Sequence, residues 1–252
     1  MNKITLITGA TSGIGLACTH IFAKHKHDLI ITGRRSDRLQ KIASELSNEY
    51  GVEVIPLTFD IRQREAVETA IEGLPEKWKK IEFLVNNAGL AAGLNPLQDG
   101  SVDDWEQMID TNVKGLLYIS RLVMPILIAN KKGHIINVGS IAGKEVYPSG
   151  NVYCGTKHAV DAITKGMRID LVQHGIKVTQ IAPGLVETEF SIVRFKGDEE
   201  RAEKVYQGYK PLMPEDVAEV IFYVTTLPDH VNINDLVIMP TAQASATIVH
   251  KT

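Results

Sequence analysis

The feature that most constrains this chain is a regular alternation of short apolar segments with longer segments of helical spacing. The apolar segments are rich in β-branched residues, and several are apolar on successive positions, which is typical of strands covered on both faces. They lie at residues 4–8, 29–32, 52–58, 83–86, 134–138, 177–181 and 236–239. Helical spacing occurs at residues 13–26, 37–50, 62–73, 102–130, 152–174 and 214–226.

This alternation predicts a parallel sheet with helices on both faces, because parallel strands need long crossover connections. Right-handed crossovers then lead to a doubly wound α/β Rossmann fold with a seven-stranded parallel sheet. No Pro/Gly/Ser-rich linker, internal repeat or low-complexity tract divides the 252 residues. We therefore expect a single domain over residues 1–252.

Charge and composition argue against several kinds of partner. The net charge is −3 without a polybasic block, so neither nucleic acid nor an anionic membrane surface is indicated. The N-terminus lacks the pattern of a signal peptide, and the apolar stretch 116–129 is interrupted and too short to span a bilayer. Two cysteines cannot form a disulfide framework, and the eight histidines show no metal-ligand spacing. We expect a cytoplasmic protein without a metal ion.

A glycine-rich turn, Thr8-Gly-Ala-Thr-Ser-Gly-Ile-Gly15, follows the first apolar segment directly. Glycines let the backbone turn sharply and approach a ligand closely, and the following helix directs free N–H groups at an anion. At the start of a βαβ unit this predicts a site for a dinucleotide pyrophosphate, although a tight connection without a ligand has the same spacing. The site would consist of Gly9, Thr11, Ser12, Gly13, Ile14 and Gly15.

Two arginines, Arg34 and Arg35, follow about 20 residues after the glycine turn. In dinucleotide-binding folds an acid at this distance holds the ribose 2′-hydroxyl of NAD, whereas arginine accommodates the 2′-phosphate of NADP. The planar guanidinium donates bidentate, charge-assisted hydrogen bonds to phosphate. No acid occurs between the end of the second apolar segment, at residue 32, and Asp37, so the sequence predicts NADP.

Two further positions each have two interpretations. Asp60 ends the third apolar segment, and it either accepts from the adenine amino group, with Ile61 packed on the ring, or caps the next helix. Asn112 falls within a helical pattern, although asparagine is a mediocre helix former. It is either an incidental surface residue or one that perturbs the helix and holds a water near Lys157.

Tyr153 and Lys157 lie four residues apart in the predicted helix 152–174, and therefore on one face of it. A cation in that position favours phenolate and would lower the tyrosine pKa from its usual value of about 10. A phenol of that kind can exchange a proton with an alcohol or carbonyl oxygen near neutral pH. Taken alone, the pair is also typical of a solvated helix face.

Together these motifs resemble the short-chain dehydrogenase/reductase family in order and spacing. They are the glycine turn, Asn86-Asn-Ala-Gly89, Asn112, Ser140, Tyr153-x-x-x-Lys157 and Pro183-Gly184. The resemblance implies that Tyr153 is the proton donor and acceptor and that Lys157 lowers its pKa and bonds the nicotinamide ribose. It also implies that Ser140 polarises the substrate oxygen and that Asn112 supports a proton relay. Further cofactor contacts would come from Asn87, Ala88, Gly89, Pro183, Gly184, Val186 and Thr188.

Downstream segments resemble the NADP-dependent 3-hydroxy acid dehydrogenase subgroup of that family. They include Glu189-Phe-Ser-x-Val-Arg-Phe-Lys-Gly-Asp198 and Thr226-Leu-Pro-x-His-Val-Asn-Ile-Asn234. The resemblance implies oxidation of small 3-hydroxy acids of the L-serine, L-allo-threonine or 3-hydroxypropionate type, or reduction of the matching 3-oxo acids. It also implies a cytoplasmic homotetramer and a substrate loop at about residues 185–213.

Within that loop Arg194 and Lys196 form a basic pair, and we expect Arg194 to bind the substrate carboxylate, with Tyr147 nearby. The alternative is that both cations are solvated or make subunit contacts. A 3-oxoacyl thioester or ketone reductase would use the same catalytic residues, and an NADP-binding regulatory protein would keep the fold without turnover. The polar tail 241–252 is expected to be frayed or to lie over a neighbouring subunit.

Overall fold

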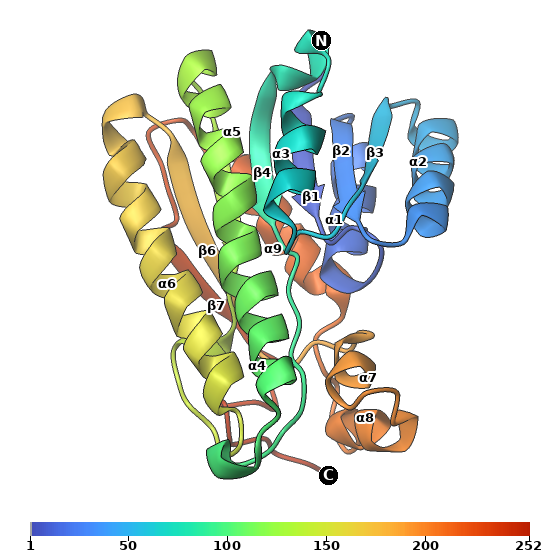
Figure 1. Cartoon of the computed structure of the whole chain (residues 1–252), viewed down its shortest axis with the longest axis vertical. Helices are drawn as coiled ribbons and strands as arrows, with labels where there is room; N and C mark the ends of the chain where they lie inside the picture. The colour runs from blue at the N-terminus through green and yellow to red at the C-terminus, as the bar shows by residue number, and fades with distance from the viewer. Residues whose placement is uncertain (1) are drawn as a thin grey trace.

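The computed structural model describes residues 2–252 as a seven-stranded, wholly parallel sheet with helices on both faces (Figure 1). The strand order is β3-β2-β1-β4-β5-β6-β7. The strands are β1 (Ile4–Thr8), β2 (Asp28–Gly33), β3 (Val54–Thr58), β4 (Ile81–Asn86), β5 (His134–Val138), β6 (Lys177–Pro183) and β7 (Asp235–Ile238). The predicted doubly wound α/β fold is confirmed.

Successive strand residues point to opposite faces, so each strand contributes to two cores. Ile7 and Ile31 pack against one group of helices, and Leu6 and Ile30 against the other. The first group is α1 (Gly13–Lys24), α2 (Ser36–Tyr50) and α9 (Pro214–Thr225). The second is α3 (Arg64–Glu72), α5 (Leu116–Asn130) and α6 (Asn151–Leu171). Short 3₁₀ turns occur at Glu76–Lys79, Leu97–Asp99, Ile141–Gly143 and Val172–His174.

The helix predicted at residues 102–130 is a continuous helical run with an irregular centre. It consists of α4 (Val102–Ile109), a π-helical turn (Asp110–Gly115) and α5. By length and composition alone the run Val102–Asn130 could cross a membrane. The inner face of α5 is buried in the core of the domain, through Leu116, Ile119, Ser120, Val123 and Leu127.

Two short helices project at one end of the molecule, in the segment that follows β6 (Figure 1). They are α7 (Phe190–Arg194) and α8 (Glu199–Tyr206). The base of this segment is closed by backbone hydrogen bonds, from the Glu187 N–H to the Leu212 carbonyl and from the Leu212 N–H to the Leu185 carbonyl. The segment is therefore a compact flap rather than an open loop.

The C-terminal tail lies at the same end of the molecule (Figure 1). Buried Gln243 accepts a 2.8 Å hydrogen bond from the Leu185 N–H, and the Thr252 N–H donates to the Gly208 carbonyl. The Ala246 N–H donates to Glu145. The expectation of a frayed tail is wrong, because these contacts tie the tail to its own chain. The other expectation, that the tail lies over a neighbouring subunit, stays a prediction.

Candidate active site

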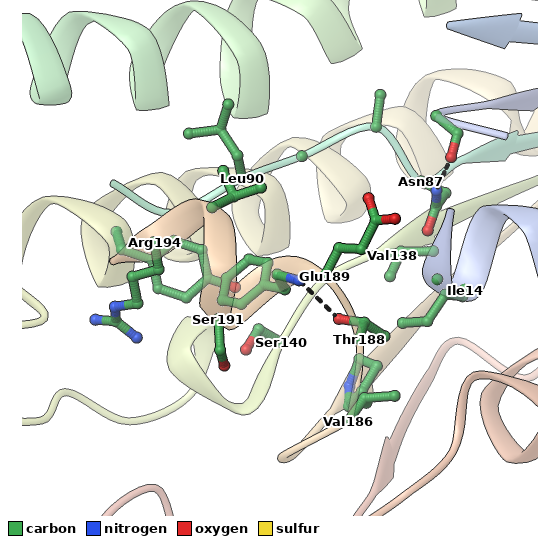
Figure 2. A pocket seen from close by; sticks show the side chains of 18 of the residues that line it. Ile14, Asn87, Leu90, Val138, Ser140, Val186, Thr188, Glu189, Ser191 and Arg194 are labelled. Atoms are coloured by element: carbon green, nitrogen blue, oxygen red, sulfur yellow. Dashed lines mark hydrogen bonds between the residues drawn. The ribbon is translucent and has the colours of Figure 1, made fainter. Parts of the chain in front are cut away.

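A cavity of about 550 Å³ opens at the carboxyl ends of the strands, where the predicted site residues come together (Figure 2). The predicted residues that line it are Gly9, Thr11, Ser12, Gly13, Ile14, Arg34, Arg35, Asp60, Ile61, Asn87, Ala88, Gly89, Ser140, Tyr147, Tyr153, Lys157, Pro183, Gly184, Val186, Thr188 and Arg194. Gly15 and Asn112 are not in the lining, because they support it from behind.

The glycine turn forms a cradle that side chains would obstruct. A Cβ atom added to Gly15 would lie 2.2 Å from the Gly9 carbonyl oxygen and 2.4 Å from Nδ2 of Asn87. Gly9 and Gly13 have φ values of +68° and +52°, which favour glycine. The Ser12 side chain does not cap α1, so no side chain competes with an anion for the first N–H groups of this helix. These features fit a dinucleotide pyrophosphate.

The end of β4 is tied to the end of β1 next to this cradle. The Asn87 side-chain amide donates a 2.9 Å hydrogen bond to the Thr8 carbonyl oxygen. In return, the Thr8 hydroxyl accepts from the N–H groups of Asn87 and Ala88, each at 3.0 Å. These bonds hold the Asn-Ala-Gly segment open along the cavity, where it leaves room for a ribose.

Arg35 lies against the glycine turn. Its guanidinium donates to the Thr11 hydroxyl through Nε and Nη2, at 3.1 and 2.7 Å, and to the Ser12 hydroxyl at 2.9 Å. Its Nη1 atom forms an ion pair of 2.9 Å with Glu189. A cation therefore stands at the adenosine end of the cavity, where the sequence places the 2′-phosphate site.

Asp60 lines the same end of the cavity but does not cap the next helix. Its carboxylate is paired with Arg62 at 2.6 Å and accepts from the Arg62 N–H, whereas the N-cap of α3 is Gln63. The capping interpretation is wrong, because the chain makes another turn before α3 begins. Ile61 packs near Asp60 as part of the lining.

Asn112 is only 2% exposed, so the interpretation as an incidental surface residue is wrong. Its Oδ1 accepts from the Leu90 N–H at 2.9 Å, and its Nδ2 donates to the Leu90 carbonyl and to the Thr156 hydroxyl. It lies in the π-helical turn, and such turns are frequent at functional sites. Asn112 thus bridges the segment after β4 to α6.

Ser140 and Tyr153 both line the cavity. The Ser140 hydroxyl accepts from the Ala142 N–H at 3.1 Å and also interacts with the Tyr153 phenol. Burial raises the pKa of Tyr153, and Tyr147 raises it further, while the Ser140 hydroxyl and Arg194 lower it by less. The predicted lowering of this pKa is therefore not found, because desolvation disfavours a buried phenolate.

Lys157 is directed at the end of β5. Its Nζ atom donates a 3.0 Å hydrogen bond to the Val138 carbonyl oxygen. Burial lowers the pKa of its ammonium group to about 8. The interpretation of Tyr153 and Lys157 as a solvated helix face is wrong, because both side chains are buried. The lysine can therefore change its protonation state in a range close to neutral pH.

Arg194 lies beside the phenol of Tyr153. Its guanidinium stands over the rings of Tyr147 and Tyr153, at 5.4 and 5.7 Å from the ring centroids. Its Nε donates to the Gly93 carbonyl, whereas within residues 2–252 its buried Nη2 atom has no hydrogen-bond partner. Lys196, the other cation of the predicted pair, forms an ion pair with Asp104 at 3.0 Å instead.

Several lining residues were not predicted from the sequence. The Phe190 ring meets the Tyr153 ring edge-on at 5.6 Å, and Glu189 pairs with Arg35. Both follow Thr188 directly, and this adjacency was the available signal. Gln243 and Ala246 reach the cavity from the tail, for which no local pattern gives a signal. Within residues 2–252 no group of three or more His, Cys, Asp or Glu residues is placed to hold a metal ion.

The family model described as "short chain dehydrogenase" matches residues 3–199. The chain belongs to this family. The NADP-dependent 3-hydroxy acid dehydrogenase YdfG of Escherichia coli (strain K12) is 49% identical to it over 250 residues, which cover 98% of this chain and 99% of that protein. Sulfoacetaldehyde reductase 2 of Chromohalobacter salexigens is 47% identical over 245 residues, covering 97% of this dehydrogenase and 96% of that protein.

Among solved structures, the closed form of serine dehydrogenase complexed with NADP⁺ superimposes on this dehydrogenase with a TM-score of 0.92. The two are 49% identical, and the match covers 99% of this chain and 100% of the other. The dehydrogenase is an oxidoreductase that acts on hydroxyl groups and depends on NADP. The predicted family, enzyme class and cofactor are confirmed.

Proposed function

We propose that this dehydrogenase interconverts a small 3-hydroxy acid and the matching 3-oxo acid, with L-serine, L-allo-threonine and 3-hydroxypropionate as the candidate hydroxy acids. The names of two relatives, a 3-hydroxy acid dehydrogenase and a serine dehydrogenase, support this class of substrate. NADP supplies the acceptor and donor of hydride. The chain itself must hold the carboxylate and move the hydroxyl proton.

The observation that carries the proposal is the position of Arg194. Its buried Nη2 atom has no hydrogen-bond partner within residues 2–252, and its guanidinium stands over the rings of Tyr147 and Tyr153. A buried guanidinium donor without a partner is costly, and a substrate carboxylate would satisfy it with a charge-assisted hydrogen bond. Bound there, a three-carbon hydroxy acid brings its β-hydroxyl towards the phenol of Tyr153.

In this proposal Tyr153 accepts the proton of the β-hydroxyl during oxidation and returns it during reduction. Ser140 donates a hydrogen bond to the reacting oxygen and stabilises the charge that develops on it. The ammonium group of Lys157 stabilises the phenolate form and bonds the cofactor ribose. Asn112 holds the surrounding backbone and supports proton transfer between Lys157 and solvent.

The test compares Arg194→Ala with the control Lys196→Ala, because Lys196 is exposed and paired with Asp104. Initial rates with NADP would be measured on 3-hydroxypropionate, L-serine and L-allo-threonine, and on 1-propanol, which lacks the carboxylate. Loss of a charge-assisted bond predicts that Arg194→Ala raises KM for the acids by about 10- to 100-fold. An unchanged KM for the acids in Arg194→Ala would exclude this role. An acetoacetyl thioester reduced faster than any 3-oxo acid would favour the alternative reductase.

A small sulfonated substrate is a second candidate, which the relative named sulfoacetaldehyde reductase 2 supports. The sulfonate is an anion that Arg194 would bind through the same Nη2 atom. Sulfoacetaldehyde and malonic semialdehyde place a carbonyl carbon one carbon from the anionic group. A comparison of NADPH-dependent rates on these two aldehydes decides between the head groups.

We also propose a cytoplasmic homotetramer. Apolar side chains at the C-terminal end of α6 and in the turn after it are strongly exposed in the single chain, with Ile169 at 74% and Val172 at 71%. Exposed apolar groups of this kind are typical of subunit contacts when they are clustered. Light scattering should give the mass of four chains, and a monomeric mass at micromolar concentration contradicts the proposal.

A further inference from the structure

Glu189 bridges two arginines across the cofactor end of the cavity. One carboxylate oxygen meets Arg35 Nη1 at 2.9 Å and the other meets Arg38 Nη1 at 2.8 Å. Arg35 and Arg38 are located at the start of α2, whereas Glu189 directly precedes α7. These two ion pairs therefore connect the dinucleotide-binding part of the sheet to the flap that carries Arg194.

The groups around the Glu189 carboxylate form a site suited to phosphate. Arg35 is the extended N-cap residue of α2 and Arg38 lies in the first turn of that helix, and both guanidiniums meet the same carboxylate. The hydroxyls of Thr11 and Ser12 hold Arg35 in place at 2.7 and 2.9 Å. Guanidinium forks match the oxygens of phosphate as well as those of a carboxylate. Glu189 thus places an anion where two arginines are available.

A phosphate and the Glu189 carboxylate would not share this site readily. The side chain before Glu189 already lies on the glycine turn, because a Cβ atom on Gly13 would be 3.1 Å from Cγ2 of Thr188. Burial raises the pKa of the Glu189 carboxyl, but Arg38 and Arg35 lower it by more, so it is charged at neutral pH. Two anions in contact repel each other.

We propose that Glu189 is a built-in competitor for the 2′-phosphate of NADP, which binds Arg35 and Arg38 and displaces the carboxylate. Arg38 is then a second arginine of the 2′-phosphate site. The inference rests on NADP dependence and on the proposed role of Arg35.

The exchange has a consequence at the other end of the cavity. Glu189 is the N-cap residue of α7. This short helix carries Phe190, which contacts the ring of Tyr153, and Arg194, which stands over the same ring. In Figure 2 the side chains of Glu189 and Arg194 point away from each other. Release of Glu189 by the 2′-phosphate therefore frees the start of α7. NAD, which lacks this phosphate, leaves Glu189 bound to the arginines.

Calorimetric titration of the full chain with 2′,5′-ADP and with NAD⁺ tests the competition. We expect Glu189→Gln to bind 2′,5′-ADP about two- to fivefold more tightly than the wild type, since partly exposed ion pairs contribute modestly. Its affinity for NAD⁺ should not change. The matched control is Glu187→Gln, because Glu187 is exposed and its side chain makes no ion pair within residues 2–252. Weaker or unchanged binding of 2′,5′-ADP by Glu189→Gln overturns the proposal.

Hydrogen exchange of residues 190–194 tests the release of α7. The probe is again 2′,5′-ADP, because it has no nicotinamide and cannot reach Tyr153. We expect it to increase exchange in the wild type and to have no effect in Glu189→Gln, and unchanged exchange in the wild type contradicts the coupling. Arg35→Ala and Arg38→Ala should each weaken 2′,5′-ADP binding. If neither variant weakens the binding, Arg35 and Arg38 do not bind the 2′-phosphate. That outcome contradicts the position of the phosphate site, whereas unchanged binding by Glu189→Gln contradicts only the competition by Glu189.

Discussion

The ammonium group of Lys157 donates a 3.0 Å hydrogen bond to the carbonyl oxygen of Val138, the last residue of β5. Ser140 follows two residues later, and the turn after it packs directly on α6. A Cβ atom on Gly143 would lie 2.6 Å from the Lys157 carbonyl oxygen. One strand end therefore positions the lysine, the serine and, through α6, the tyrosine.

Replacement of Tyr153 by phenylalanine should remove proton transfer and leave cofactor binding intact. General acid–base catalysis contributes about 10²- to 10⁴-fold, so kcat should fall by that factor. The phenyl ring keeps the contact with Phe190 and hence the local packing. Steady-state rates and the NADP dissociation constant would be measured together. A kcat within threefold of the wild type is incompatible with Tyr153 as the proton donor.

Lys157→Met should gain stability while it loses activity. Burial lowers the Lys157 pKa from 10.5 to about 8, so between these values the unfolded chain binds the proton that the folded chain has lost. The unfolding free energy of the wild type therefore rises with pH across this window. The destabilisation caused by burying the charged lysine is largest below pH 8. The methionine variant buries no charge, which should stabilise it at pH 7 by at most about 3 kcal/mol relative to the wild type. Loss of the hydrogen bond to Val138 offsets roughly 1 kcal/mol of that gain. Urea unfolding at pH 7 and pH 10 should show this advantage shrinking, and a constant difference would refute the assignment.

Gly15→Ala should disrupt the cradle of the cofactor. The added methyl group would overlap the Gly9 carbonyl oxygen at 2.2 Å, so the turn must shift. We expect a loss of more than about 2 kcal/mol of unfolding free energy and much weaker NADP binding. Gly166→Ala in α6 is the control, because nothing lies within 4 Å of its added Cβ atom. It should raise stability by about 0.5–1 kcal/mol.

Lys144→Met should slow catalysis from outside the cavity. Lys144 pairs with Asp161 of α6 and with Asp235 at the start of β7, and so holds the turn after Ser140 on the helix of Tyr153. We expect kcat to fall about tenfold, because misplacement of the serine weakens its bond to the reacting oxygen. Lys144→Arg should restore most of the rate.

The control for Lys144 is Lys165→Met. Lys165 pairs with the same Asp161 but is 59% exposed, and within residues 2–252 its side chain forms no other ion pair. We expect steady-state kinetics to give Lys165→Met the same kcat as the wild type. Equal losses in the two variants would mean that the charge of Asp161, rather than the position of the turn, affects the reaction.

The parts of the molecule that were predictable depend on short stretches of sequence. The alternating apolar segments, the glycine turn and the Tyr153–Lys157 spacing each reflect local geometry, so the sheet, the cofactor class and the shared helix face could be derived. Asn112 was ambiguous, because its sequence neighbours do not reveal that Leu90 and Thr156 supply its partners.

Burial and long-range contacts explain where the structure differs from what the sequence predicted. The Tyr153 pKa was expected to be lowered, but the sign depends on how far the phenol is removed from water, which the helix pattern does not indicate. The tail was expected to be frayed because its sequence is polar and unpatterned. It is ordered by single contacts such as Gln243 with Leu185, separated by 58 residues.

The sequence by itself determined the doubly wound sheet, the glycine turn after β1 and the placing of Tyr153 and Lys157 on one helix face, because these depend on residues only a few positions apart. Only the tertiary structure decided that Arg194 stands over Tyr153 and that Glu189, 154 residues from Arg35, reaches its guanidinium. Such contacts arise when the flap after β6 folds back over the sheet edge. Their distances are set by the packing of the whole domain, which no local pattern encodes.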